Sequence, residues 1–277
     1  MRRLLICLAA LLCLAGCGRK QAESVNVPIL MYHHMDDVGG TDTVISVDGF
    51  RRQMDVLREN GYEPVSFDEL IAYVNEDGAL PEKPVCVTFD DGYLSTYETA
   101  WPILGEYGYP ATVFAIGCSV GHEFYKDTQY PMTPHFGVEA IAEMVSSGRM
   151  AVQSHTYDMH QWGPFEETDL PRTSILPLEG ESEADYTAAL TEDFRREEAI
   201  LAQGGVERID VLAYPLGRYS DLTEQVLREL GVRVTLTIDS THINTVTRGD
   251  PDSLYHLGRL NMTDGTGDEV LLEYLQQ

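Results

Sequence analysis

Short apolar runs alternate with segments of helical spacing along most of the chain. The runs are rich in β-branched and aromatic residues, which is typical of buried strands, whereas the segments between them place apolar residues on one face of a helix. Strands are expected at residues 27–32, 84–89, 111–116, 150–153, 209–214, 232–237 and 256–261. Helices are expected at residues 48–60, 67–75, 94–107, 137–147, 183–203, 221–230 and 268–275.

This alternation predicts βα units around a parallel sheet. The number of units suits a distorted (β/α) barrel of about seven parallel strands, with an open doubly wound sheet as the second choice. In both folds, ligands bind at the carboxyl ends of the strands. The polar or turn residues at the ends of the expected strands are therefore the first candidates for chemistry: His33, Asp90, Asp91, His155, Tyr214 and Pro215.

Two of these strand ends carry a pattern typical of a hydrolytic metal site. One apolar run ends in the pair Asp90-Asp91, and a later strand is followed by His155 and, five residues on, by His160. Adjacent side chains leaving a strand point in different directions, so one carboxylate could bind a metal while the other stays free as a base. Two histidines and a carboxylate are a ligand set of catalytic zinc. The ordinary alternatives are an Asp-Asp-Gly turn and structural histidines.

Two further strand ends carry weaker signals. His33 and His34 follow the first expected strand and could equally form a turn with one ring buried. Tyr214, Pro215 and Leu216 follow a later strand and could be no more than a turn. Alternatively, the backbone N–H of Leu216 could stabilise an oxyanion.

Together these residues resemble the motifs of the polysaccharide deacetylases, the carbohydrate esterase family 4 or NodB-like enzymes. The similarity lies in Thr88–Asp91, in His155 with His160, and in a strand that ends in Tyr-Pro. The opening segment, residues 29–34, is similar to the permuted branch that includes poly-N-acetylglucosamine deacetylases, in which the histidine-bearing strand comes first. The resemblance covers essentially all of residues 27–277.

The resemblance implies an enzyme that removes N-acetyl groups from an extracellular polysaccharide containing N-acetylglucosamine and releases acetate. It further implies that Asp91, His155 and His160 bind one divalent metal ion. The metal is most often zinc in this family, and cobalt, nickel or manganese are alternatives. The expected partner is therefore an N-acetylated glycan substrate, and the sequence identifies no protein partner.

The resemblance also assigns catalytic roles. Asp90 would be the general base, His33 the general acid, and the backbone N–H of Leu216 would help to hold the oxyanion. Tyr214 and Pro215 of the third motif would contribute to substrate binding.

One departure from the family pattern affects the base. The third motif commonly contains an arginine that steadies the base, and this chain has Ala213 at the start of the corresponding segment. A base without its cation would differ in pKa and orientation. Arg172, in the loop after His160, is our candidate for the missing cation, and a solvated loop arginine is the ordinary alternative. Aromatic residues of the same long loops, above all Trp162, are candidates for stacking on a sugar.

The first residues have the pattern of a lipoprotein signal. Arg2 and Arg3 precede a short apolar run, and Cys17 follows Leu-Ala-Gly as in the bacterial lipobox. An ordinary signal peptide with a chance cysteine is the alternative. We therefore expect a secreted bacterial lipoprotein, anchored to a membrane at the cell envelope through Cys17. The expected organisation is a signal peptide at 1–17, a tether at 18–26 and a deacetylase domain at 27–277.

The net charge bears on the possible partners, and the cysteine content bears on whether the protein contains a disulfide. Removal of Arg2 and Arg3 takes the formal net charge from −26 to −28, which argues against nucleic acid as a partner. After cleavage only Cys86 and Cys118 would remain beside the anchor, and buried free thiols are a better expectation than a disulfide.

Three other functions remain compatible with the sequence. The chain could be a catalytically weak or inactive glycan-binding lipoprotein of the same fold, which the missing arginine favours and the complete set of acidic and histidine residues opposes. It could hydrolyse small amides or cyclic imides, as other members of the family do. A solute-binding lipoprotein would need two lobes, and no boundary between lobes is visible.

Overall fold

The computed structural model describes residues 23–277, so the expected signal peptide and Cys17 lie outside the described residues. The expected tether ends earlier than predicted, because β1 (Ser24–Asn26) already pairs antiparallel with β11 (Thr245–Thr247). Within residues 23–277, no helix has the length and apolar character needed to cross a membrane.

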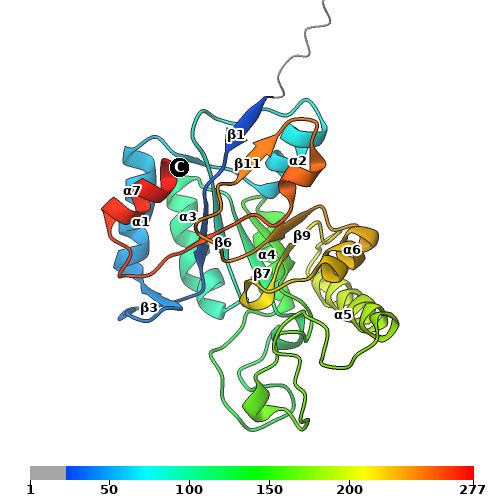
Figure 1. Ribbon diagram of the computed structural model, residues 1–277. Helices are drawn as coiled ribbons and strands as arrows, with labels where there is room; N and C mark the ends of the chain where they lie inside the picture. The colour runs from blue at the N-terminus through cyan, green and yellow to red at the C-terminus, as the bar shows by residue number, and fades with distance from the viewer. Residues whose placement is uncertain (1–22) are drawn as a thin grey trace, which may run out of the picture.

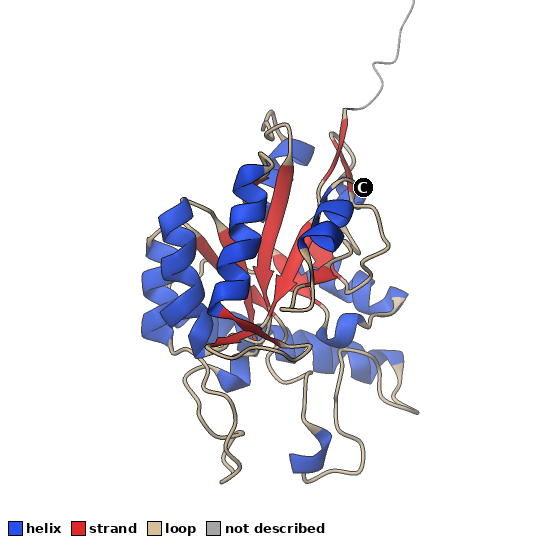
Figure 2. Cartoon of the chain, turned by 90° about the vertical axis from the view of Figure 1, so that its left-hand side faces the viewer, coloured by secondary structure: helices blue, strands red, loops and turns tan. Residues whose placement is uncertain are grey.

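A curled parallel sheet forms the centre of the molecule, and helices cover its outer face (Figure 1, Figure 2). Its strands follow the order β10-β9-β8-β7-β6-β2-β12, with β5 attached to β6. The strands are β2 (Ile29–Tyr32), β5 (Glu63–Pro64), β6 (Pro84–Phe89), β7 (Ala111–Ala115), β8 (Met150–Ser154), β9 (Val211–Ala213), β10 (Val234–Leu236) and β12 (Leu260–Asn261). The order has no reversal of the doubly wound kind, so the predicted distorted (β/α) barrel is confirmed.

The sheet curls almost into a closed barrel. Its two edges are β10 and β12, and Leu257 forms a parallel bridge with Leu236 just before the chain enters β12. The N–H of Thr237 donates to the Leu257 carbonyl at 2.8 Å, and the Leu257 N–H donates to the Thr235 carbonyl at 2.9 Å. Residues 257–261 therefore link the two edges of the sheet, and we call them the closing segment.

Helix boundaries follow the capping signals. The helices are α1 (Val47–Glu59), α2 (Phe67–Asn75), α3 (Trp101–Tyr107), α4 (Val138–Ser146), α5 (Glu183–Gln203), α6 (Asp221–Leu230) and α7 (Asp268–Leu275). Helices α2, α5, α6 and α7 have the predicted bounds; a capping box of Ser66 and Glu69, for example, fixes the start of α2. The segment predicted as a helix at 94–107 instead contains a π-helical turn, η1 (Thr96–Ala100), followed by α3.

Two hydrophobic clusters hold the sheet from its two faces. Along β6, Val85 and Val87 belong to the cluster that includes residues of α1, α3, α4 and α5, whereas Cys86 belongs to the cluster that includes residues of β9, β10 and α2. This alternation is the period of a strand buried on both faces. Cys86 is thus an interior residue, and it and the half-buried Cys118 are both free thiols.

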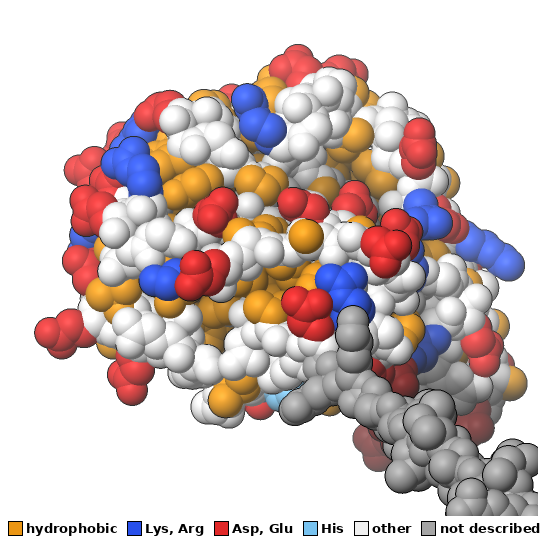
Figure 3. All heavy atoms as spheres, turned by 90° about the horizontal axis from the view of Figure 1, so that it is seen from above, with side chains coloured by type: hydrophobic (Ala, Val, Ile, Leu, Met, Phe, Trp, Pro, Cys, Tyr) orange, Lys and Arg blue, Asp and Glu red, His pale blue; other side chains and the backbone are white. Residues whose placement is uncertain are grey.

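Long loops project from the carboxyl ends of the strands. Residues 116–137 connect β7 to α4 and residues 155–182 connect β8 to α5, and both extend from the end of the barrel opposite β1 (Figure 1). Figure 3 views the other end, where Asp and Glu side chains are scattered and Lys and Arg lie between them. The acidic side chains on this face are therefore dispersed and do not form a single patch.

Candidate active site

The three predicted metal ligands lie together at the carboxyl ends of β6 and β8. One potential ligand atom from each of Asp91, His155 and His160 lies within 4.8 Å of the other two. Asp91 Oδ1 is 3.5 Å from His155 Nε2 and 4.0 Å from His160 Nε2. A tetrahedral zinc ion with bonds of about 2.0–2.1 Å separates its ligand atoms by roughly 3.4 Å. The three side chains therefore fit such an ion with only a small contraction.

The backbone turns sharply at both strand ends that carry these ligands. Asp91 has φ 71° and Thr156 has φ 73°, in the left-handed region that non-glycine residues seldom occupy. The Thr156 N–H donates to Ser154 Oγ at 3.0 Å, and Thr156 Oγ1 accepts from the Met159 N–H at 3.2 Å. Such conformations cost about 1–3 kcal/mol and persist where the surroundings hold them, often at functional sites.

His155 is prepared as a metal ligand by its surroundings. Its Nδ1 lies 2.8 Å from the Ala213 carbonyl, and this contact requires Nδ1 to carry the proton, which leaves the lone pair on Nε2, the atom nearest Asp91. Burial lowers the pKa of His155 to about 4, despite the opposing charges of Asp90 and Asp91. At neutral pH the ring is therefore uncharged, as metal binding requires.

The predicted base, Asp90, is held by an arginine that we did not predict. Arg259, completely buried in the closing segment, donates from Nη1 to Asp90 Oδ1 at 2.6 Å and from Nη2 to Oδ2 at 2.8 Å. Its Nε donates to the Thr237 carbonyl at 2.9 Å. Burial would raise the pKa of Asp90, but Arg259, His155 and His33 together hold it well below its usual range. Asp90 is therefore ionised at neutral pH.

The hypothesis that Arg172 supplies this cation is wrong. Arg172 donates instead to Glu181, in the loop that precedes α5. The sequence did contain a signal for Arg259, because an arginine inside an expected buried strand requires a partner for its charge.

His33 lies at the same site, directly after β2. Its charge is among the causes that lower the pKa of Asp90 and of Asp91, where burial acts in the opposite direction. Its Nδ1 is buried and, in the described part of the chain, has no hydrogen-bond partner. The structure thus places the predicted acid beside the carboxylate pair.

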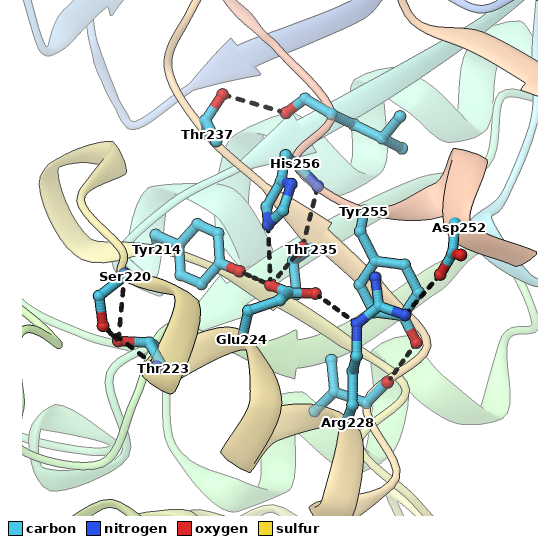
Figure 4. Close-up of polar contacts among 12 residues, drawn as sticks. Tyr214, Ser220, Thr223, Glu224, Arg228, Thr235, Thr237, Asp252, Tyr255 and His256 are labelled. Atoms are coloured by element: carbon cyan, nitrogen blue, oxygen red, sulfur yellow. Dashed lines mark hydrogen bonds and ion pairs between the residues drawn. The ribbon is translucent and has the colours of Figure 1, made fainter. Parts of the chain in front are cut away.

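Tyr214 and Pro215 do not have the predicted contact with a substrate, because both side chains are buried. The Tyr214 hydroxyl donates to Glu224, which also accepts from Arg228 Nε at 3.1 Å and pairs with His256 Nε2 at 3.2 Å (Figure 4). This network anchors the turn that follows β9. The neighbouring Leu216 is left-handed, with φ 57°, and the role of its N–H stays a prediction.

A groove of about 470 Å³ extends from the metal ligands along the long loops. Asp91 and His160 line it together with Trp162, whose side chain is 53% exposed. A larger hollow of about 670 Å³ lies at the amino ends of β7 and β8 and has no motif residue in its lining. The groove that contains the ligands is therefore the candidate substrate site.

Two groove residues were missed by the sequence reasoning. Tyr93 lies two residues after Asp91, and burial together with the negative charge of Asp91 raises the Tyr93 pKa. The ring of His135 lies 4.9 Å from that of Tyr93, and both side chains line the groove. Tyr93 could have been suspected from its position two residues after Asp91, whereas His135 gave no such signal.

Comparison with known proteins gives the family that the sequence motifs resemble. The sequence profile described as polysaccharide deacetylase matches residues 77–235, more than half of the chain. YxkH of Bacillus subtilis (strain 168), whose name places it among the polysaccharide deacetylases, is 26% identical over 257 residues, which are 93% of this chain and 78% of that protein. The poly-beta-1,6-N-acetyl-D-glucosamine N-deacetylase of Staphylococcus aureus (strain MRSA252) is 24% identical over 82% of this chain and 70% of that enzyme.

A solved structure agrees with the sequence relatives. IcaB from Ammonifex degensii superimposes with a TM-score of 0.72 and 28% identity, covering 91% of this chain and 97% of that one. The profile match excludes both His33 and Arg259, which lie before and after it in the sequence and return to the site through β2 and the closing segment. The chain belongs to the polysaccharide deacetylase family.

Proposed function

We propose that the protein is a metal-dependent hydrolase that removes N-acetyl groups from a polysaccharide containing N-acetylglucosamine. The observation that carries this proposal is the convergence of Asp91, His155 and His160 beside an Asp90 that Arg259 keeps ionised. The name of the Staphylococcus aureus relative supports the substrate class, because that relative is a poly-beta-1,6-N-acetyl-D-glucosamine N-deacetylase.

Asp91, His155 and His160 would hold one divalent ion, which we propose to be zinc, with cobalt, nickel or manganese as alternatives. Such an ion supplies Lewis-acid polarisation of a carbonyl and lowers the pKa of a bound water. The nitrogen-rich ligand set suits zinc, since two imidazoles and one carboxylate with an open fourth position form a catalytic zinc site.

The remaining residues move protons and hold charge. Asp90 removes a proton from the attacking water as that water adds to the acetamide carbonyl carbon. Arg259 keeps both oxygens of Asp90 in a fixed plane, which makes Asp90 a weaker base but orients it and keeps it ionised. His33 delivers a proton to the departing amine, and the N–H of Leu216 stabilises the oxyanion. The products are acetate and a glucosamine unit.

An inactive glycan-binding protein is the second candidate, and its main support was the missing motif arginine. Because Arg259 supplies that cation from the closing segment, the set of charged groups around Asp90 is complete. A small-amide hydrolase would have no use for a groove that extends from the ligands to the exposed Trp162.

Acetate release is the experiment that tests the proposal. The form beginning at Gln21 would be incubated with β-1,6- and β-1,4-linked N-acetylglucosamine oligomers, with and without zinc or cobalt. We expect metal-dependent release that favours one linkage and is abolished in Asp90→Asn. Trp162→Ala is expected to raise KM for long oligomers more than for short ones. A metal-binding protein that releases no acetate from any oligomer would favour the glycan binder.

We further propose that the protein is secreted and anchored to a membrane of the cell envelope through a lipid on Cys17. Arg2, Arg3 and the Leu-Ala-Gly-Cys sequence support this proposal. Mass spectrometry of the membrane-extracted protein should find a diacylglyceryl-modified Cys17 as the first residue, and Cys17→Ser should abolish the modification. An unmodified chain cleaved at another residue would identify an ordinary signal peptide.

A further inference from the structure

The loop between the two histidine ligands is held from behind by a carboxylate on α5. Asp193 Oδ2 accepts the N–H of Tyr157 at 2.8 Å, and Oδ1 accepts the N–H of Asp158 at 2.8 Å. Only 8% of Asp193 is exposed. Both oxygens of one buried side chain are therefore used by two consecutive amides of the loop.

The same loop is fixed on its other side by backbone bonds. The Gly117 N–H donates to the Thr156 carbonyl at 3.2 Å, and the Cys118 N–H donates to the Tyr157 carbonyl at 2.9 Å. Residues 156–158 are thus held between the turn after β7 and helix α5. Without Asp193, two part-buried amides would lose their acceptor, and the loop would lose its hydrogen bonds to α5 while it kept those to the β7 turn.

These contacts of Asp193 matter for the metal site because the loop that they hold sets the angle between the rings of His155 and His160. His155 and His160 approach each other with ring centroids 5.3 Å apart and planes at 76°. Between them the chain passes through Thr156, with its left-handed φ of 73°. A short loop that contains such a conformation relaxes when its restraints are removed, and relaxation would move the two imidazoles apart.

A second buried carboxyl faces the same space. Glu197, one helical turn after Asp193, is fully buried, its two carboxylate oxygens have no hydrogen-bond partner among the described residues, and burial raises its pKa well above the usual value. Burial also raises the pKa of Asp193, to about 6, although the two N–H donors and Arg196 oppose the shift and Asp158 adds to it. Burial thus disfavours the charged form of both carboxyls, and the two N–H donors of the loop favour the charged form of Asp193.

We propose that Asp193 is a positioning residue for the metal centre, holding the loop in the conformation in which His155 and His160 both point at Asp91. This inference rests on the proposed function, because it assumes that the three ligands bind a metal. Its energetic basis is preorganisation, since a loop that is already in place loses less conformational freedom on binding the ion. Residues that orient metal ligands typically change affinity by about 10–100-fold when removed.

The test measures metal affinity directly and needs no substrate. Zinc Kd would be measured by competition with a chromophoric chelator for the wild type, Asp193→Asn and Glu192→Gln. Glu192 is the exposed neighbour on the same helix, so its variant makes the same charge change without touching the loop. We expect Asp193→Asn to weaken zinc binding at least tenfold and Glu192→Gln to change it less than twofold.

Hydrogen exchange of the metal-free protein gives the second readout. In Asp193→Asn the amides of Tyr157 and Asp158 should exchange faster, while amides of β6 and β7 keep the wild-type rates. If Asp193→Asn does not fold, Asp193→Ser takes its place, because the single, shorter hydroxyl of serine cannot accept from both amides. A zinc Kd within twofold of the wild type in the folded variant would overturn the positioning role. A wild type that binds no zinc, cobalt, nickel or manganese would overturn the metal-dependent function itself.

Discussion

Arg259→Met is expected to lower acetate release about a hundredfold and to destabilise the protein by about 3–5 kcal/mol. Methionine fills much of the volume of the arginine side chain but leaves Asp90 as a buried, uncompensated carboxylate. The pKa of Asp90 should rise in this variant, because burial raises it and Arg259 is the strongest of the groups that lower it. The base would then be partly protonated and free to rotate. Denaturant unfolding and steady-state acetate release measure the two effects.

A double variant separates stability from catalysis. Adding Asp90→Asn to Arg259→Met removes the buried charge, so the free energy of unfolding should recover by several kcal/mol while activity stays absent. Arg259→Lys should retain part of the stability but lose the two-pronged contact, with activity between the wild type and Arg259→Met. Wild-type turnover in Arg259→Met would show that Asp90 needs no cation and would refute this account of the site.

Loss of a metal ligand is the second large effect. His155→Ala is expected to lower zinc affinity and to reduce acetate release by about a thousandfold or more, because Lewis-acid stabilisation is worth several kcal/mol. Treatment of the wild type with a chelator should cause the same loss, and added zinc should reverse it. The measurements are bound metal per chain by elemental analysis and acetate release before and after the addition of metal.

His122→Ala is the matched control for this experiment, since His122 is exposed and is not among the converging ligands. It should keep both the metal and the activity. If His155→Ala released acetate at the wild-type rate after complete removal of metal, the hydrolysis would not depend on the ion, and Asp90 and His33 alone would have to account for it.

Local signals explain why much of the fold was predictable from the sequence. Helix α2 begins where Ser66 and Glu69 form a capping box, and Gly231, with a φ of 98°, caps the end of α6. The Asp90-Asp91 pair and the two histidines were predictable for a related reason: each follows a recognisable strand, and parallel strands bring their carboxyl ends to one edge of the barrel.

The predictions that were wrong or missing concern contacts between residues that lie far apart in the sequence. Arg259 lies 169 residues from Asp90 in the sequence, and although a buried arginine needs a charged partner, nothing local indicates that the partner is Asp90. Arg172 was chosen because it lies near His160 in the chain, but it binds Glu181 instead. Tyr214 was assigned to the substrate because of its motif, whereas its acceptor, Glu224, lies on α6 and turns the side chain into the protein.

The closing segment couples the charge state of the base to complete pairing of the sheet. It carries Arg259, joins β10 to β12, and pairs with β2 near the opposite end of the chain. Such distant pairings close a long loop, and the conformational entropy lost in that closure opposes their formation. A chain in which this segment is not yet docked therefore has its aspartates and histidines but lacks the partner of its base. Full activity therefore requires residues 257–261 to be docked between β10 and β2, so the last part of the chain to pair with the sheet completes the base.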